Sequence, residues 1–305
     1  MDKYIQELVV EKRSVSEQGA LADYIPALSK VHPDHLGIGV YDETGNYFEA
    51  GDSRVNFTIQ SVSKPLVFLL ALIEHGEEAV FQKVGKEPTG DPFNSIIRLE
   101  TFDERKPLNP FINAGAISIV SLIKGIDNIE KIEKILNFIR LLADNEDIHV
   151  DTSVFLSEKV TGDRNRSMIY FLKSIGNIDG NVDEILDLYF MQCAIKANCK
   201  DLARIGLILA QRGYDPIRKK QIIPKRPVQI VNALMATCGM YDASGEFAVK
   251  VGIPAKSGVG GGILCASPGK FGIGVYGPAL DEKGNSIAGV EMLRDLSEKF
   301  DLSIY

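Results

Sequence analysis

Residues 57–66 read Phe-Thr-Ile-Gln-Ser-Val-Ser-Lys-Pro-Leu, and this stretch decides the fold that we predict. A serine and a lysine three residues apart, here Ser61 and Lys64, lie on the same face of one helical turn. That geometry suits a serine nucleophile whose proton is taken by an amine rather than by an imidazole. The alternative is that Ser61 caps a helix and Lys64 is a surface charge, and the tetrad alone does not separate the two.

The residues that follow predict where the helix begins. The run 65–73 is apolar on every side, which is typical of a buried helix. Pro65 is best tolerated in the first helical turn, so we expect the helix to begin near Ser61. The serine then lies at the positive end of the helix dipole, where a developing oxyanion is stabilised. The same field, together with burial, should lower the pKa of Lys64.

Composition restricts the class of protein. The chain has 305 residues, enough for one large domain or two closely packed ones, and 45% apolar with 25% charged residues is ordinary for a soluble globular protein. A net charge of −7 argues against a nucleic-acid partner. The longest apolar run is far shorter than the roughly 20 residues that span a bilayer, so we expect no membrane partner. The polar N-terminus lacks a secretion signal, which predicts a cytoplasmic protein.

The cysteines and histidines give no metal-site pattern. No Cys-x-x-Cys pair is present, and we interpret the four cysteines as buried or incidental thiols in a reducing compartment. They are Cys193, Cys199, Cys238 and Cys265. His32-Pro-Asp-His35 has two possible ligands, but a loop with solvated histidines explains it better. We therefore expect no metal.

The order of the expected elements predicts an α+β fold. The first thirty residues look helical, in stretches around residues 5–9 and 21–28. A hairpin at 36–41 and 46–50 and a short strand near 55–60 come next, then mostly helical periodicity to about 220. A strand meander at 254–276 and a closing helix at 287–299, capped by Asn285 or Ser286, complete the chain.

We interpret this order as an antiparallel sheet layered with helices, plus an inserted all-helical domain. The predicted sheet domain is discontinuous and comprises residues 1–64 and 221–305. The helical domain comprises residues 65–220, and the active site should lie where the two domains meet.

Further motifs bear on the chemistry. Lys256-Ser257-Gly258, on a predicted strand, matches the third element of enzymes that begin with Ser-x-x-Lys, and a backbone N–H there can complete an oxyanion hole. No Ser-Asp-Asn stands in the helical block, so a β-lactamase would lack its middle motif.

Two polar motifs occupy the helical block instead. Asn113 lies near an expected helix start, where it could equally be a simple cap. Glu158 and Asn165 flank a glycine-containing turn, and a lone surface glutamate is the default interpretation unless both are buried.

Taken in order, these segments resemble the serine-dependent glutaminases, which share the fold of serine β-lactamases and penicillin-binding proteins. The matching segments run from about residue 20 to 290. They are Ala22-Asp-Tyr24-Ile-Pro, Phe57-Thr-Ile-Gln-Ser61-x-Ser-Lys64, Asn109-Pro-Phe-Ile-Asn113-Ala-Gly-Ala-Ile, Ser157-Glu158 with Asn165, Tyr189-Phe-Met-Gln-Cys, Gly239-Met-Tyr241-Asp-x-Ser-Gly, Pro254-Ala-Lys-Ser-Gly-Val259 and Gly284-Asn-Ser-x-x-Gly.

The resemblance implies hydrolysis of L-glutamine to L-glutamate and ammonia without a cofactor. Ser61 would be the nucleophile and Lys64 its activating partner, and Tyr241 or Tyr189 could carry a proton to the leaving ammonia. The substrate-binding residues would be Ser61, Asn113, Glu158, Asn165, Tyr189, Tyr241 and Val259, with Tyr24 and Gln60 close by. Such enzymes are commonly homo-oligomers, so we expect a tetramer or a dimer.

Two other functions fit parts of the pattern. A β-lactam-interacting or peptidase-like acyl-serine hydrolase would share Ser61 and Lys64, but the missing Ser-Asp-Asn weighs against it. A non-catalytic amino-acid-binding protein would keep the pocket, yet it would have no use for the activating amine.

Overall fold

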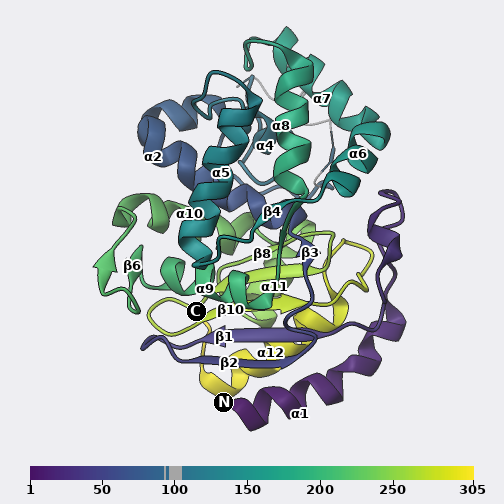
Figure 1. Ribbon diagram of the computed structural model, residues 1–305, viewed down its shortest axis with the longest axis vertical. Coiled ribbons are helices and arrows are strands. Elements are labelled where there is room, and N and C mark those ends of the chain that lie inside the picture. The colour runs from purple at the N-terminus through teal and green to yellow at the C-terminus, as the bar shows by residue number, and fades with distance from the viewer. Residues whose placement is uncertain (93, 96–104) are drawn as a thin grey trace.

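The structure is a computed structural model that describes residues 1–92, 94–95 and 105–305. A sheet with its covering helices forms one end of the molecule, and a block of helices forms the other (Figure 1). The largest sheet is antiparallel throughout. The predicted α+β class is therefore confirmed.

The main sheet joins the two ends of the chain. Its strand order is β2-β1-β10-β9-β8. β1 pairs with β10, so the N-terminal hairpin and the C-terminal meander, both predicted, complete one sheet. The strands are β1 (Gly37–Tyr41), β2 (Tyr47–Gly51), β8 (Ala255–Ser257), β9 (Gly262–Ala266) and β10 (Gly272–Tyr276).

Helices cover both faces of this sheet. One face packs on α1 (Asp2–Lys12), α11 (Ser244–Lys250) and α12 (Ile287–Phe300), whose apolar side chains share a core with the strands. The predicted cap of the closing helix is Ser286, whose Oγ accepts a hydrogen bond from the Gly289 N–H at 3.2 Å. The other face is covered by α9 (Cys199–Ala210), which lies against β10, β9 and β1.

Glycines let α9 approach the sheet closely. A Cβ on Gly274 would lie 2.2 Å from the carbonyl oxygen of Cys199 and 2.7 Å from the Leu202 side chain. A Cβ on Gly272 would lie 1.9 Å from the Leu207 nitrogen. Because backbone atoms of α9 cannot retreat without moving the whole helix, these positions require glycine.

The helical block surrounds the first half of α2 (Ser63–Lys83), which is buried on all sides as predicted. α2 changes direction at Gly76, where φ is +80°. The other helices of the block are α4 (Asn113–Val120), α5 (Asn128–Ala143), α6 (Thr152–Thr161), α7 (Asp163–Ser174) and α8 (Val182–Cys193). Their apolar faces form a second core together with α9 and α10 (Lys225–Cys238).

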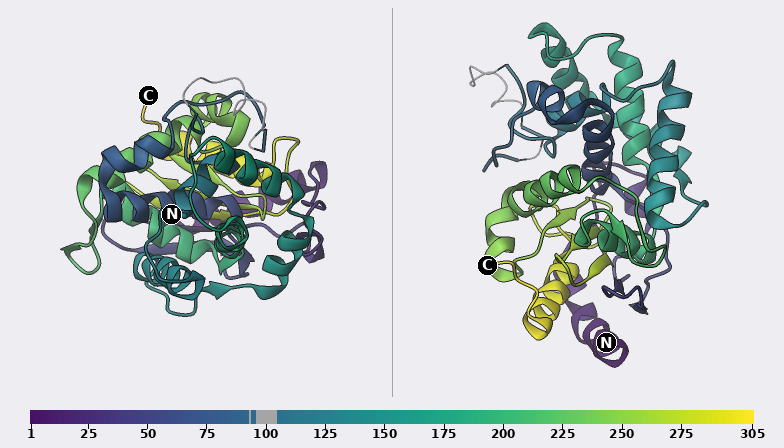
Figure 2. Two further views of the ribbon diagram at one scale, coloured as in Figure 1. Left: turned by 90° about the horizontal axis from the view of Figure 1, so that it is seen from above. Right: turned by 90° about the vertical axis from the view of Figure 1, so that its left-hand side faces the viewer.

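Short strands connect the two parts. β3 (Phe57–Thr58), β5 (Ile195–Ala197) and β4 (His149–Val150) form a small separate sheet. β6 (Tyr214–Asp215) and β7 (Lys220–Gln221) pair with each other at the edge of the molecule. α10 lies between β8 of the main sheet and α2, and it contacts both (Figure 2).

Two local predictions were wrong. The predicted strand at 55–60 shrinks to Phe57–Thr58, because Gln60 has a φ of +48° and begins a 3₁₀ turn, Gln60–Val62, that leads into α2. The second helical stretch at 21–28 is not a helix. Only Leu28–Lys30 forms a 3₁₀ turn there, and the preceding 3₁₀ helix ends at Gln18. Pro26 has no N–H to continue a helix through this segment.

The domain boundaries remain a prediction. The division between residues 64 and 65 falls after the first two residues of α2, where the sheet unit gives way to the helical block. The packing of α9 on the main sheet favours an earlier end of the helical domain than residue 220. None of the described helices is long and apolar enough to cross a bilayer.

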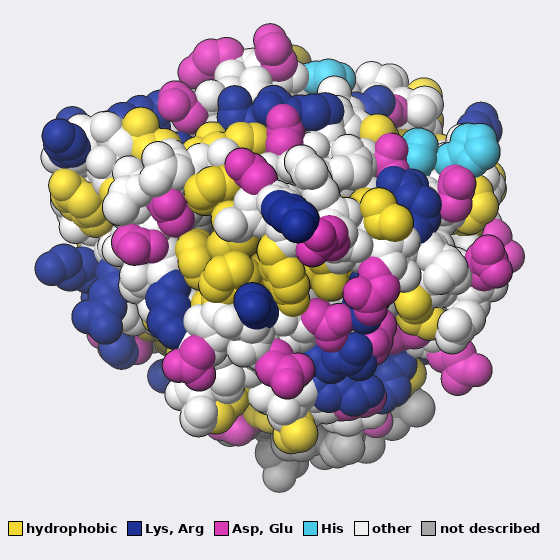
Figure 3. Space-filling model, turned by 90° about the horizontal axis from the view of Figure 1, so that it is seen from below, with side chains coloured by type: hydrophobic (Ala, Val, Ile, Leu, Met, Phe, Trp, Pro, Cys, Tyr) yellow, Lys and Arg dark blue, Asp and Glu magenta, His cyan; other side chains and the backbone are white. Residues whose placement is uncertain are grey.

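Charges of both signs are interspersed on the face seen from below (Figure 3). The net charge of −7 is therefore not gathered there as a single acidic field. Such a mixed surface steers no ligand of one sign from a distance.

We predict that Gly274→Ala destabilises the fold by ~1–3 kcal/mol, because its methyl group would overlap the Cys199 carbonyl of α9. Urea unfolding measures this change. Gly245→Ala is the matched control, since its Cβ would meet no atom within 4 Å and the residue lies in α11. This control should gain about 0.5 kcal/mol. Equal stability of the two variants would contradict the packing argument.

Candidate active site

Ser61 lies in the 3₁₀ turn Gln60–Val62, between β3 and α2. Ser63 stabilises the turn by donating its hydroxyl to the Gln60 carbonyl at 2.7 Å. The loop after β8 comes close to this turn, since a Cβ on Gly258 would lie 2.5 Å from the Ile59 carbonyl oxygen. The small residues of the Lys-Ser-Gly strand therefore bring its backbone close to Ser61.

Lys64 is buried one turn further along, with 1% of its surface exposed. Its Nζ donates hydrogen bonds to Asn113 Oδ1 at 2.7 Å and to the Phe111 carbonyl at 3.1 Å. Burial lowers the pKa of Lys64 to about 8, while the charge of Glu158 opposes that shift. The predicted direction is confirmed, and the alternative of a surface charge is wrong.

Asn113 is the first residue of α4, and its side chain caps nothing. Its Nδ2 donates to Asn165 Oδ1 at 3.0 Å, while its Oδ1 accepts from Lys64. The capping interpretation is therefore wrong. Asn113 instead links the buried amine to Asn165 on α7, which partly faces solvent.

Glu158 is a buried carboxylate near the end of α6. Its Oε1 accepts a hydrogen bond from Gln60 Nε2 at 2.8 Å. Burial raises the pKa of Glu158 to about 8, against the opposing effects of Gln60 and Lys64. The default of a surface glutamate is wrong for this residue.

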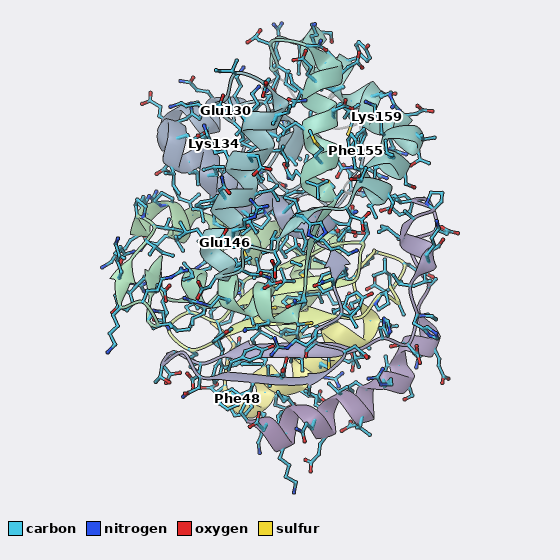
Figure 4. The ribbon with its side chains drawn as sticks, viewed as in Figure 1. Phe48, Glu130, Lys134, Glu146, Phe155 and Lys159 are labelled. Carbon is cyan, nitrogen blue, oxygen red and sulfur yellow. The ribbon has the colours of Figure 1, made fainter. Side chains whose placement is uncertain are left out.

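The residue that follows Glu158 on α6 lies at the surface. Lys159 pairs with Asp187 on α8 at 2.7 Å and lies 5.8 Å from the Phe155 ring centroid. Figure 4 shows Lys159 and Phe155 on the outside of the helical block. Glu158 itself is buried on the side of α6 that faces Gln60.

Most of these side chains line one cavity of about 270 Å³. Of the residues predicted for the site, the cavity is lined by Tyr24, Gln60, Ser61, Asn113, Glu158, Asn165, Tyr189 and Val259. Lys64 and Tyr241 are not among its lining residues. Lys64 reaches the cavity through Asn113, and Tyr241 is adjacent to Ser61 and to the backbone of Val259.

Tyr241 has an unusual backbone and a buried ring. Its φ is +55°, a left-handed conformation that is rare for a residue with a Cβ. Burial raises the pKa of Tyr241, while hydrogen bonding to Ser61 and to the Val259 backbone lowers it. Burial also raises the pKa of Tyr189, which is hydrogen-bonded to Cys193.

Sequence reasoning missed several neighbours of the site. Cys193 lines the cavity rather than an unrelated part of the core, and its spacing of four from Tyr189 on α8 was a usable signal. Burial raises the pKa of the Cys193 thiol, so the thiolate is disfavoured. Arg164 lies at the cavity mouth, where its Nε donates to the Asn94 carbonyl at 2.6 Å.

All four cysteines are free and buried, as predicted. Within residues 1–92, 94–95 and 105–305, no three histidine, cysteine, aspartate or glutamate side chains cluster as metal ligands would. The polar lining of the cavity thus comprises two hydroxyls, amides, phenols, a thiol, one guanidinium group and one carboxylate.

The family model for glutaminases matches residues 19–305. The chain belongs to the glutaminase family. A glutaminase from Bacillus cytotoxicus is 54% identical over 301 residues, which cover 99% of this chain and 97% of that one. The predicted family is therefore confirmed.

Solved glutaminases share this fold. A probable glutaminase from Bacillus subtilis, complexed with 6-diazo-5-oxo-L-norleucine, superposes with a TM-score of 0.91 at 41% identity, covering 98% of this chain and 95% of that chain. A covalent complex of the Bacillus subtilis glutaminase with 5-oxo-L-norleucine gives 0.89 at 39% identity, covering 99% of both chains. The predicted serine β-lactamase-like fold is confirmed for this enzyme.

Proposed function

We propose that this enzyme hydrolyses L-glutamine through a glutamyl ester on Ser61. Its membership of the glutaminase family establishes that it is a hydrolase acting on glutamine. The contribution of individual residues is our proposal. It is supported by the burial of the Lys64 amine beside the turn that carries Ser61, with a pKa near 8. An amine with that pKa is partly uncharged at neutral pH and can act as a base.

Glutamine is a zwitterion, and the cavity offers partners for both charges. Glu158 is the carboxylate in the cavity, so we assign it to the α-ammonium group. Asn113, Asn165 and the tyrosine hydroxyls can donate hydrogen bonds to the α-carboxylate or to the side-chain amide. Tyr24, half exposed, and Gln60 would complete the walls of the site.

In the first step Ser61 Oγ attacks the amide carbon of the glutamine side chain, and its proton passes to the neutral Lys64 Nζ. Backbone N–H groups of Ser61 and Val259 hold the oxyanion. The C–N bond then breaks as the nitrogen takes up a proton, which Tyr241 relays from Lys64, and ammonia leaves. The contact between Tyr241 and Ser61 favours Tyr241 over Tyr189 for this relay.

In the second step water attacks the glutamyl ester and gives up a proton through the same amine. Ser61 regains its proton and L-glutamate leaves, so the enzyme returns to its starting state and no redox group is needed. Asparagine is one methylene shorter than glutamine. A methylene contributes roughly 1–3 kcal/mol to discrimination, so asparagine should be a poor substrate rather than an excluded one.

Two broader properties follow from the resemblance to the family. We propose that the enzyme is a homo-oligomer, a tetramer or a dimer. We also propose that it acts in the cytoplasm, where its four free cysteines would stay reduced.

We predict that Ser61→Ala lowers ammonia release from glutamine by at least ~10³-fold, because the nucleophile is lost. The variant should also fail to gain the mass of the 5-oxo-L-norleucine adduct when it is treated with 6-diazo-5-oxo-L-norleucine. Ser297→Ala is the matched control. It removes another buried serine hydroxyl, one that donates to Val251 far from the cavity, and should keep wild-type turnover. Undiminished glutamine consumption by Ser61→Ala would refute the nucleophile.

We predict that kcat at saturating glutamine rises with pH and reaches its plateau below the free-enzyme pKa of about 8, since only neutral Lys64 accepts the Ser61 proton and the bound α-ammonium group should lower the pKa of Lys64 further. Below the plateau, kcat should fall up to tenfold per pH unit. Steady-state ammonia release between pH 6 and 9 measures the profile. A flat profile would show that another group, or an already neutral amine, acts as the base.

We predict that Glu158→Gln raises KM for glutamine by ~30-fold or more, because a buried charge partner of the α-ammonium is removed. The amide keeps an oxygen for the hydrogen bond from Gln60. Glu146→Gln, at a surface carboxylate labelled in Figure 4, is the control and should leave KM unchanged. An unaltered KM in Glu158→Gln would place the ammonium elsewhere.

A measurement of folding stability distinguishes the loss of substrate binding in Glu158→Gln from a loss of folding. The pKa of Glu158 is raised from an ordinary value near 4.5 to about 8 in the folded state, so the folded protein binds the extra proton. The stabilisation of the folded state by this proton is therefore fully present below pH 4.5 and is lost as pH rises through 8. Glu158→Gln carries no such charge, and it should be at least as stable as wild type at pH 9 in urea unfolding.

A further inference from the structure

Lys256 is a second buried lysine beside the site, and neither the nucleophile nor its base uses it. It lies on β8, and its side chain is fully enclosed. Its Nζ donates to the carbonyls of Gly239 at 3.0 Å and of Ser257 at 2.6 Å. The same nitrogen lies 4.2 Å from the centroid of the Tyr241 ring.

Two N–H donors of Lys256 meet carbonyl oxygens, and its nitrogen also lies over the electron-rich ring of Tyr241, a contact that favours a cation. Burial and the neighbouring Lys64 act in the opposite direction and lower the pKa of Lys256. Because burying an amine is costly, these contacts indicate a specific role for Lys256 in this part of the structure.

The contacts converge on the corner that carries Tyr241. The Gly239 carbonyl also accepts from the Ser257 N–H at 3.1 Å, and a Cβ on Gly239 would lie 1.7 Å from the Ala255 carbonyl oxygen. Two residues later Tyr241 adopts its left-handed φ of +55°. Ser244 Oγ fixes the other side by accepting from the Met240 N–H and donating to the Tyr241 carbonyl.

We propose that Lys256 is a positioning residue for Tyr241: it holds both the Gly239 carbonyl and the ring face, so that the phenol stays beside Ser61. Lys256 is not among the residues that line the substrate cavity, so it acts on the reaction through Tyr241. The role rests on the proton relay assigned to Tyr241 above. A purely structural lysine would instead stabilise the fold and leave the contribution of the Tyr241 hydroxyl unchanged.

A double-mutant cycle separates these roles. Lys256→Met keeps the length of the stem and removes the amine, and Tyr241→Phe keeps the ring and removes the hydroxyl. Lys256→Met should lower kcat at least ~10-fold with KM changed less than ~3-fold. The double variant should have a kcat within ~3-fold of the slower single variant, because one hydroxyl cannot be lost twice.

If the two losses of kcat multiply in the double variant, or if Lys256→Met keeps full activity, the positioning role is wrong. If the proposed proton relay is wrong instead, Tyr241→Phe alone should retain wild-type kcat. Lys12→Met is the matched control, since Lys12 is also buried but pairs with Asp295 at 2.6 Å on α12. It should leave kcat unchanged.

Folding is monitored by thermal unfolding and by reaction of Ser61 with 6-diazo-5-oxo-L-norleucine. If Lys256→Met does not fold, Lys256→Gln replaces it in the same cycle, because its amide still offers a donor on a shorter stem. A crystal structure of the folded variant gives the second readout. The Tyr241 hydroxyl should move away from Ser61, and an unmoved hydroxyl would overturn the proposal.

Discussion

The hydrogen bonds from Lys64 to Asn113 and to the Phe111 carbonyl are the interactions on which the site depends. An amine buried without acceptors would be expelled or would remain permanently neutral, and one in water would remain charged. Burial lowers its pKa to about 8, between these extremes, while the charge of Glu158 opposes the shift. Both acceptors come from the segment at the start of α4, so the helical block holds in place the amine that follows the nucleophile by one turn.

The two ends of the molecule contribute different parts of the chemistry. The helical block supplies the charged and amide side chains Asn113, Glu158 and Asn165, while the loop after β8 brings its backbone close to the turn that carries Ser61. Gln60 and Tyr241 flank this contact, and both have left-handed backbones. Such conformations persist only where surrounding contacts hold them. Here Ser63 fixes the first, and the corner with Ser244 and Lys256 fixes the second.

Local patterns made much of this predictable from sequence. The Ser61 and Lys64 turn and the antiparallel hairpin follow from spacing, from Pro65 and from turn residues, all of which act within a few positions. The strand expected at 55–60 failed for a local reason as well, since a left-handed Gln60 cannot be recognised from a run of β-formers. Contacts between residues that are distant in the sequence could not be predicted from it. Nothing near Asn113 indicates that its oxygen meets Lys64, and nothing near Lys256 indicates that its amine faces the Tyr241 ring.

The charges around the cavity imply that glutamine binding and proton transfer would be coupled in the mechanism that we propose. Glu158 and Lys64 both have a pKa near 8, and each charge stabilises the other. Arrival of an α-ammonium group beside Glu158 favours the carboxylate form. If Glu158 holds the α-ammonium group as proposed, the substrate's cation would balance that carboxylate, and the positive charge on Lys64 would be stabilised less. Binding of glutamine would then favour the neutral amine that the nucleophile requires, so the pocket that binds the substrate would also prepare the base.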